Sequence, residues 1–262
     1  MIKRFVVWNG TTINPKYQNI AHIRDAVLAL RPLTPTGRAR WSLEWAVKAG
    51  EGGTWQSAFD PHPMSLHGAD HLGHLVRLGR ELRPPLRVTP YVNVRGRAEW
   101  NEAEWDQIVD CARAARRVIL NVEPGDQFWN GPTDQGELQE VYTDPLSERL
   151  RREAPGAWVE VAMVPLPGFV ARLGGVGCLA AWMSLANHAS WECYEQINQD
   201  LAPDQSIPRV RGWAAETGWG QGARYEFPIV DPVAVGKWAN STYGRYGLGV
   251  WHLDGVDGGE GE

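Results

Sequence analysis

The chain of 262 residues has little of several features that mark whole classes of protein. It contains no apolar run near the roughly 18 residues that a membrane-spanning helix needs, so we expect no membrane partner. The apolar run that follows Lys3 and Arg4 is four residues long, too short for a signal peptide. The three cysteines (Cys111, Cys178 and Cys193) are an odd number without metal-ligand spacing. This argues against a disulfide scaffold and fits a reducing compartment.

Signals for cofactors and nucleic acids are also missing. The sequence has no glycine-rich dinucleotide fingerprint, no phosphate-binding loop and no serine nucleophile elbow. The net charge of −5 argues against a nucleic-acid-binding surface. We therefore expect no cofactor and no nucleic-acid partner, and we expect a soluble bacterial or phage protein that is cytoplasmic or virion-associated.

Tryptophan, in contrast, is abundant. The chain has 14 tryptophans, more than its 7 tyrosines and 5 phenylalanines together. A GC-rich genome favours tryptophan codons, and indoles are ordinary core residues. Indoles also stack on the flat apolar faces of sugars, so the composition leaves a structural and a ligand-binding interpretation open.

Short apolar runs alternate with stretches of helical spacing along the whole chain. The runs begin near Phe5, Leu43, Val88, Val118, Val159, Leu179, Val210 and Leu248. Helices are expected over 20–30, 72–82, 102–116, 135–153 and 231–245, with Asn101 as an N-cap and Glu104 completing a capping box. Eight strands that alternate with helices predict the α/β class and a single (β/α)8 TIM barrel over residues 1–254, followed by a flexible acidic tail at 255–262. An open doubly wound sheet is the alternative.

Alternation within the runs predicts which side chains face the barrel interior. The inward set comprises Glu44, Ala46 and Lys48 in the second run, Thr89, Tyr91 and Asn93 in the third, Asn121 and Glu123 in the fourth, and Trp182 and Ser184 in the sixth. Its polarity increases toward the C-terminal ends of the strands, where the active sites of such barrels lie.

Two carboxylates stand at predicted strand ends. Glu123 follows Asn121 by two residues and precedes Pro124, which ends the fourth strand, and Glu216 ends the seventh run. Strands four and seven lie on opposite sides of an eight-stranded barrel, so the two carboxyls could face each other across its mouth. Glycosidic cleavage uses such a pair, with one group protonating the leaving oxygen and the other attacking the sugar or activating water.

These residues resemble those of known glycoside hydrolases. The large retaining clan with (β/α)8 barrels carries an acid/base in an Asn-Glu-Pro context on strand four, a nucleophile on strand seven and often a tryptophan on strand eight, where this chain has Trp251. Here one residue separates Asn121 from Glu123. That spacing is similar to barrels that cleave N-acetylglucosamine linkages with the help of the substrate's acetamide, and to lysozyme-like endolysin barrels with Asp-x-Glu. Each resemblance implies Glu123 as the acid/base, with Asn121 and Glu216 as further catalytic candidates.

The expected partner is an oligo- or polysaccharide. Candidate binding residues at or just after predicted strand ends are Trp8, Lys48, Tyr91, Asn93, Trp129, Trp182, Trp213, Trp219, Trp251 and Asp254. The sequence thus predicts a glycoside hydrolase that cleaves a β-linked or N-acetylated polysaccharide with Glu123 as the general acid/base.

Alternatives from other classes stay open. The chain could be a non-catalytic TIM barrel that binds carbohydrate or builds a phage tail, and Glu123 could be an ion-pair partner of Lys48, Arg95 or Arg211. His67 and His71 lie one helical turn apart, as in some zinc sites, but the His-Glu-x-x-His pattern is absent. A solvated helix face therefore explains the histidines better than a metal site, and we expect no metal.

Overall fold

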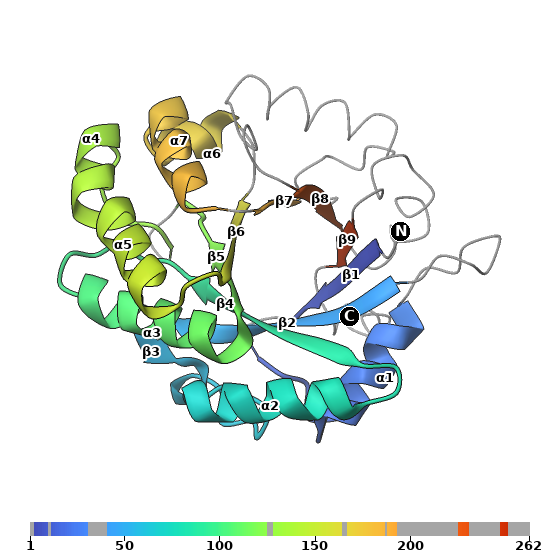
Figure 1. Cartoon of the computed structure of the whole chain (residues 1–262). Coiled ribbons are helices and arrows are strands. Elements are labelled where there is room, and N and C mark those ends of the chain that lie inside the picture. The colour runs from blue at the N-terminus through green and yellow to red at the C-terminus, as the bar shows by residue number, and fades with distance from the viewer. Residues whose placement is uncertain are drawn as a thin grey trace, which may run out of the picture.

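The computed structural model describes residues 3–9, 12–30, 41–124, 128–163, 167–186, 188–192, 225–230 and 247–250. Its centre is a curled parallel sheet with helices along the outer side (Figure 1). The parallel strands are β1 (Lys3–Trp8), β2 (Trp41–Glu51), β4 (Leu86–Asn93), β5 (Arg117–Asn121), β6 (Trp158–Met163), β7 (His188–Glu192), β8 (Tyr225–Val230) and β9 (Gly247–Val250). Each pairs with the next, and β1 also pairs with β9. The fold is therefore α/β, built on a curled parallel sheet.

Helices connect the first six of these strands. They are α1 (Ile20–Leu30), α2 (Ala69–Glu81), α3 (Asn101–Ala115), α4 (Gln135–Leu138), α5 (Asp144–Glu153), α6 (Pro167–Arg172) and α7 (Gly175–Leu185), with a π-helical turn, η2 (Gln139–Thr143), between α4 and α5. The helices predicted over 20–30, 72–82, 102–116 and 135–153 are confirmed, and the one predicted over 231–245 lies outside the described residues. Across the described ranges, no helix combines the length and apolarity needed to cross a bilayer.

The predicted alternation is confirmed on β2, β4 and β5. A small inner cluster comprises Val6, Trp8, Ala46, Tyr91, Ile119 and Ala162. The other face of the same strands, which includes Val88, Val92, Val118, Leu120 and Val122, belongs to the larger core shared with the helices. Alternate side chains of these strands therefore face either the inside of the sheet or the layer of helices.

One predicted strand is wrong. Residues 178–185 lie within α7, because this run is apolar on every side and periodicity could not separate a buried helix from a buried strand. Trp182 and Ser184 therefore belong to a helix. The sixth place in the sheet belongs to β7 and the seventh to β8. The seventh strand was predicted in the run near Val210. Residues 193–224, which include that run, lie outside the described part of the chain.

The start of α3 also differs from the prediction. Asn101 is the first helical residue, Trp100 is the N-cap, and no side chain caps the helix. The Glu104 carboxylate instead accepts hydrogen bonds from the backbone N–H groups of Arg95 (2.8 Å) and Gly96 (3.3 Å). Glu104 thus fixes the loop that follows β4 instead of completing a capping box.

The N-terminal ends of the strands, here called the N-terminal edge, hold a buried ionic cluster on the inner face. Arg4 donates hydrogen bonds to Glu44 (2.7 and 2.6 Å) and Glu160 (2.6 Å). Arg117 lies 3.3 Å from Glu44, and the Thr89 hydroxyl donates to the same carboxylate at 2.6 Å. Burial alone would raise the pKa of Glu44, but the positive charges of Arg4 and Arg117 hold it well below its ordinary value.

Candidate active site

A row of polar side chains occupies the opposite, C-terminal edge of the sheet. Glu51 of β2 pairs with Asn93 of β4, and Asn93 pairs with Asn121 of β5. Glu123 lies two residues after Asn121, and Lys48 lies three residues before Glu51 on β2. The parallel register thus brings five polar residues from three neighbouring strands to one edge, where the active sites of α/β barrels are built.

Glu123 is a largely desolvated carboxyl with a neutral partner. Asn121 Nδ2 donates to Glu123 Oε1 at 2.8 Å and to Asn93 Oδ1 at 3.2 Å. Burial raises the pKa of Glu123, and the Asn121 hydrogen bond offsets only part of that rise. Such a carboxyl keeps its proton at a higher pH than an exposed glutamate, as a general acid requires.

The two described cations that could have neutralised Glu123 are engaged elsewhere. Lys48 Nζ lies 2.9 Å from Glu51 Oε2, and Arg95 donates to Glu51 Oε1 at 2.5 Å. Burial alone would raise the pKa of Glu51, but hydrogen bonds and charge from Lys48 and Arg95 lower it. Arg211, the third candidate partner of Glu123, lies outside the described residues. One edge thus holds two carboxyls whose pKa values move in opposite directions.

The sequence prediction missed Glu51 because its strand is irregular. Strict alternation from Lys48 places Glu51 on the outer face, but the register shifts between Lys48 and Gly50 and returns Glu51 to the inner face. Gly50 has a φ of +151°, and a Cβ there would lie 1.9 Å from the carbonyl oxygen of Thr54. The glycines at positions 50, 52 and 53 were the available signal of a bulge followed by a tight hairpin to β3 (Thr54–Trp55).

Trp8 and Tyr91 form the floor below the polar row. Their rings lie 4.9 Å apart, and the Tyr91 hydroxyl donates to the backbone oxygen of Asn9 at 2.8 Å. Both side chains are fully buried inside the sheet. They therefore support the site from beneath, and their placement leaves little ring surface for a sugar.

The prediction that Trp129 and Trp182 line a cleft at the mouth is wrong. Both indoles are buried in the outer core, with ring centroids 4.9 Å apart, and Tyr142 packs at 5.0 Å from Trp129 and 5.5 Å from Trp182. The backbone N–H of Trp129 donates to the carbonyl of Glu123 at 2.8 Å. Trp129 therefore anchors the loop that follows the candidate acid, and Trp182 packs behind it.

The remaining predicted site residues lie outside the described residues. They are Glu216, Trp213, Trp219, Trp251 and Asp254. Their catalytic and binding roles stay predictions.

The histidine cluster has the geometry of a packed helix start. The rings of His67 and His71 stack with centroids 4.1 Å apart, and burial lowers the pKa of His71, with smaller effects from His67 and His74. Asp60 accepts hydrogen bonds from Ile13 N (2.9 Å) and the Ser65 hydroxyl (2.7 Å). Within the described ranges, no group of three or more metal-binding side chains is positioned to hold an ion.

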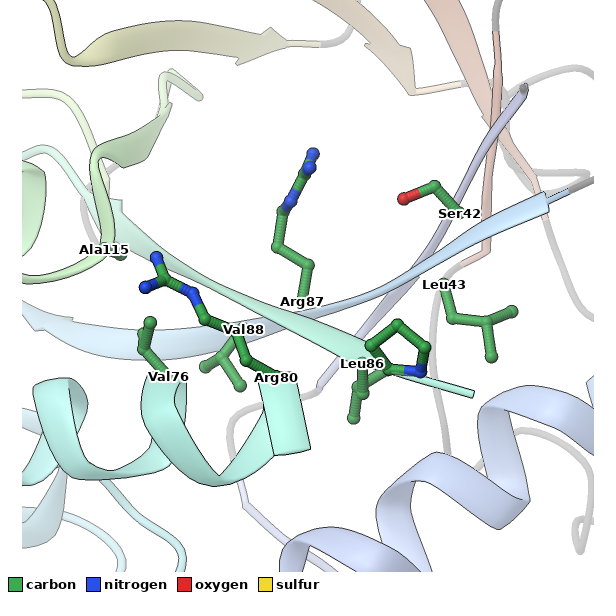
Figure 2. A pocket seen from close by; sticks show the side chains of 9 residues that line it. Ser42, Leu43, Val76, Arg80, Leu86, Arg87, Val88 and Ala115 are labelled. Atoms are coloured by element: carbon green, nitrogen blue, oxygen red, sulfur yellow. The ribbon is translucent and has the colours of Figure 1, made fainter. Parts of the chain in front are cut away.

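A cavity of about 230 Å³ lies at the other edge of the sheet, between α2 and the starts of β2 and β4. Figure 2 shows Arg80, Arg87 and Ser42 around it, together with apolar side chains such as Leu43 and Val88. Among the described residues that line this cavity there is no carboxylate, histidine or cysteine. It therefore lacks the acid and base groups that hydrolysis needs, and the C-terminal edge is the better candidate site.

Comparisons with known proteins support the fold. A solved structure with a similar fold is the C-terminal domain of a putative chitinase from Desulfitobacterium hafniense DCB-2, with a TM-score of 0.50 and 11% sequence identity. The match covers 88% of this chain and 67% of that chain. No family model matches the chain, and no curated protein matches it. At this identity the likeness is one of fold alone.

Proposed function

We propose that the protein is a glycoside hydrolase acting on a β-linked or N-acetylated polysaccharide, with Glu123 as the general acid/base. The observation that carries this proposal is the setting of Glu123, which is desolvated, hydrogen-bonded to a neutral amide and located at the C-terminal edge of the sheet. The structural neighbour from a chitinase-named protein is consistent with carbohydrate chemistry.

The proposed architecture is a complete (β/α)8 barrel in a single domain over residues 1–254. Its support is the cyclic order of strand pairing, in which β1 contacts both β2 and β9. Five successive connections between these strands contain described helices. In such a barrel the ends of all eight strands meet at one mouth, so Glu123 would face a shared substrate-binding surface.

In the proposed reaction the Glu123 carboxyl donates its proton to the glycosidic oxygen as the bond to the anomeric carbon breaks. The resulting carboxylate then takes a proton from the water that completes hydrolysis. Two nucleophiles are compatible with this role of Glu123. Glu216 could attack the anomeric carbon, or the acetamide of an N-acetylated sugar could do so.

Asn121 favours the acetamide route. Its Oδ1 atom is buried and accepts no hydrogen bond from the described residues, whereas its Nδ2 is bound to Asn93 and Glu123. A buried carbonyl oxygen without a donor is costly, and the N–H of an acetamide group would satisfy it. Asn121 would then orient the acetamide next to the acid that cleaves the bond.

The test compares Glu123→Gln with Glu99→Gln, which removes an exposed carboxylate from a loop at the same edge. Hydrolysis is measured on chitin, peptidoglycan and β-glucan, together with binding to the same polymers. We expect Glu123→Gln to lower turnover by roughly 10²–10⁴-fold and to retain binding, because the amide keeps the shape but cannot transfer the proton. Glu99→Gln should match the wild type.

Undiminished activity of Glu123→Gln would refute the assignment of the acid. A wild type that binds these polymers without hydrolysing any of them would favour the non-catalytic carbohydrate-binding barrel instead.

A further inference from the structure

The C-terminal edge carries an exposed aromatic ring beside its buried cations. Phe59 follows the short helix η1 (Gln56–Ala58) after β3, and 54% of its surface is exposed, the largest exposed fraction among the described aromatic side chains. Lys48 Nζ lies 6.0 Å from the centroid of its ring. Phe59 thus presents an open apolar ring beside the candidate site, and the charges next to it decide which ligand it suits.

Trp100 is also exposed at this edge, at 38%, but neighbouring groups cover part of its ring. A Cβ on Gly52 would lie 2.8 Å from the Trp100 ring, and the Arg97 guanidinium lies 4.6 Å from the ring centroid. Of the described aromatic rings at this edge, Phe59 is therefore best placed to receive a ligand.

The charges next to Phe59 do not balance. Lys48 and Arg95 share one carboxylate, that of Glu51, and their side chains are only 7% and 12% exposed. The Lys48 ammonium uses one of its three N–H groups on Glu51, and Arg95 Nε is buried without an acceptor among the described residues. Two buried cations against one carboxylate leave an excess positive charge with hydrogen-bond donors to spare.

Among the described residues, Asp60 and Glu104 are the buried acids nearest in the chain to Phe59 and Arg95, and both are already engaged. Asp60 accepts from Ile13 N and the Ser65 hydroxyl. Burial raises the pKa of Glu104, and its oxygens accept from the Tyr142 hydroxyl and the backbone N–H groups of Arg95 and Gly96. Glu123 is also held in a setting that favours its protonated form. A buried excess charge is unfavourable unless an anion pairs with it, and none of these carboxyls is free to do so.

We propose that Phe59, Lys48 and Arg95 form a subsite for a sugar residue that carries a carboxylate. The apolar face of the sugar would stack on Phe59, and its carboxylate would accept hydrogen bonds from Lys48 and Arg95. This inference rests on the proposed function and specifies its substrate class as an acidic glycan. The subsite is continuous with the acid, because Glu51, Asn93 and Asn121 connect it to Glu123 across neighbouring strands.

The experiment measures glycan binding in the Glu123→Gln background, so that hydrolysis does not consume the probe. Hyaluronan, which alternates N-acetylglucosamine with a carboxylate-bearing sugar, is compared with neutral chitin oligosaccharides. We expect tighter binding of hyaluronan that weakens with added salt, because salt screens the ionic contacts. Lys48→Met should lower hyaluronan affinity about tenfold or more and leave chitin binding unchanged, since only the charged contact is lost. Lys48→Arg should retain the preference.

Phe59→Ala should weaken binding of both glycans, because stacking does not depend on charge. The controls remove an aromatic ring and a cation from the N-terminal edge. Trp158→Ala removes a half-exposed ring that contacts Arg117, Arg87→Met removes a half-exposed cation, and neither should alter binding. Thermal unfolding confirms that each variant is folded.

Equal affinity for the two glycans, or an unchanged preference in folded Lys48→Met, would overturn this inference. If the wild type nevertheless hydrolyses chitin, the proposed function stands and only the acidic subsite fails. Binding to neither glycan would overturn this inference, and hydrolysis of β-glucan or peptidoglycan by the wild type would then decide the proposed function separately.

Discussion

The two edges of the sheet hold buried carboxylates in opposite electrostatic settings. At the N-terminal edge Glu44 accepts from Arg4 and Thr89 and lies beside Arg117, so its charge is fully compensated. At the C-terminal edge Glu123 accepts from the neutral amide of Asn121. The pKa of Glu44 is accordingly lowered and that of Glu123 is raised, although burial acts on both in the same direction.

This difference in electrostatic setting indicates a structural role for Glu44 and a chemical role for Glu123. A carboxylate held by several cations cannot easily take up a proton, so Glu44 is suited to closing the inner face of the sheet. A buried carboxyl that faces a neutral amide keeps its proton at a higher pH than an exposed glutamate, so Glu123 is suited to acid/base chemistry. In (β/α)8 barrels, the architecture proposed for this chain, one end likewise provides stability and the other activity.

The largest expected effect comes from breaking the N-terminal cluster. Glu44→Gln removes the charge that compensates Arg4 and Arg117, and loss of one partner from a buried ion pair costs about 3–5 kcal/mol. We expect a decrease of that size in the free energy of unfolding at pH 7, measured by denaturant titration. Glu99→Gln, which changes an exposed carboxylate, should stay within about 0.5 kcal/mol of the wild type.

The same variant has a defined pH dependence. Because the folded pKa of Glu44 lies below its unfolded value of about 4.3, its stabilising effect is complete above that pH and is lost as the pH falls below it. The difference between the wild type and Glu44→Gln should therefore shrink in acid. A difference under about 1 kcal/mol at pH 7 would contradict the structural role of the cluster.

A smaller loss of stability is expected from a change in the bulge that turns Glu51 to the inner face. In Gly50→Ala the new Cβ would meet the Thr54 oxygen at 1.9 Å and Gln107 Nε2 at 2.6 Å, so the strand must shift. We expect a loss of about 1–3 kcal/mol in stability, the usual cost of enforced backbone strain, together with weaker glycan binding. Gly68→Ala is the matched control, because Gly68 has a similar φ of +158° with no atom within 4 Å of the added Cβ. If both variants lose equal stability, steric contact at Gly50 is not what holds the bulge.

Regular periodicity predicted much of the fold. Ile20, Ile23 and Val27 are buried on α1 as their spacing indicates, and the alternation in β4 and β5 identified Tyr91 and Asn121 as inward-facing. The α7 run was mistaken for a strand because a segment that is apolar on all sides has no period to detect.

The candidate site was predicted only in part, for local reasons. Asn121 and Glu123 follow a regular strand, so their shared face could be derived from their spacing. Glu51 lies beyond a bulge that reverses the alternation of inward and outward side chains. Phe59 follows the hairpin between β2 and β3, and the spacing of apolar residues does not predict where this hairpin places it. Trp129 follows the end of a strand, as the sequence predicted. Its burial could not be predicted, because it depends on contacts with Tyr142 and Trp182, which belong to helical segments distant in the sequence.

The most direct test of the central claim is the titration of the glutamate side-chain carboxyls by carbon-13 NMR. The Glu123 signal is assigned as the one missing from Glu123→Gln, and the Glu51 signal as the one missing from Glu51→Gln. We predict that Glu123 titrates above the ordinary glutamate pKa of about 4.3 and Glu51 below it. Burial raises the pKa of both carboxyls, but the Asn121 amide offsets only part of the rise at Glu123, whereas Lys48 and Arg95 more than offset it at Glu51. A Glu123 carboxyl that titrates at or below the ordinary value would contradict its role as the proton donor.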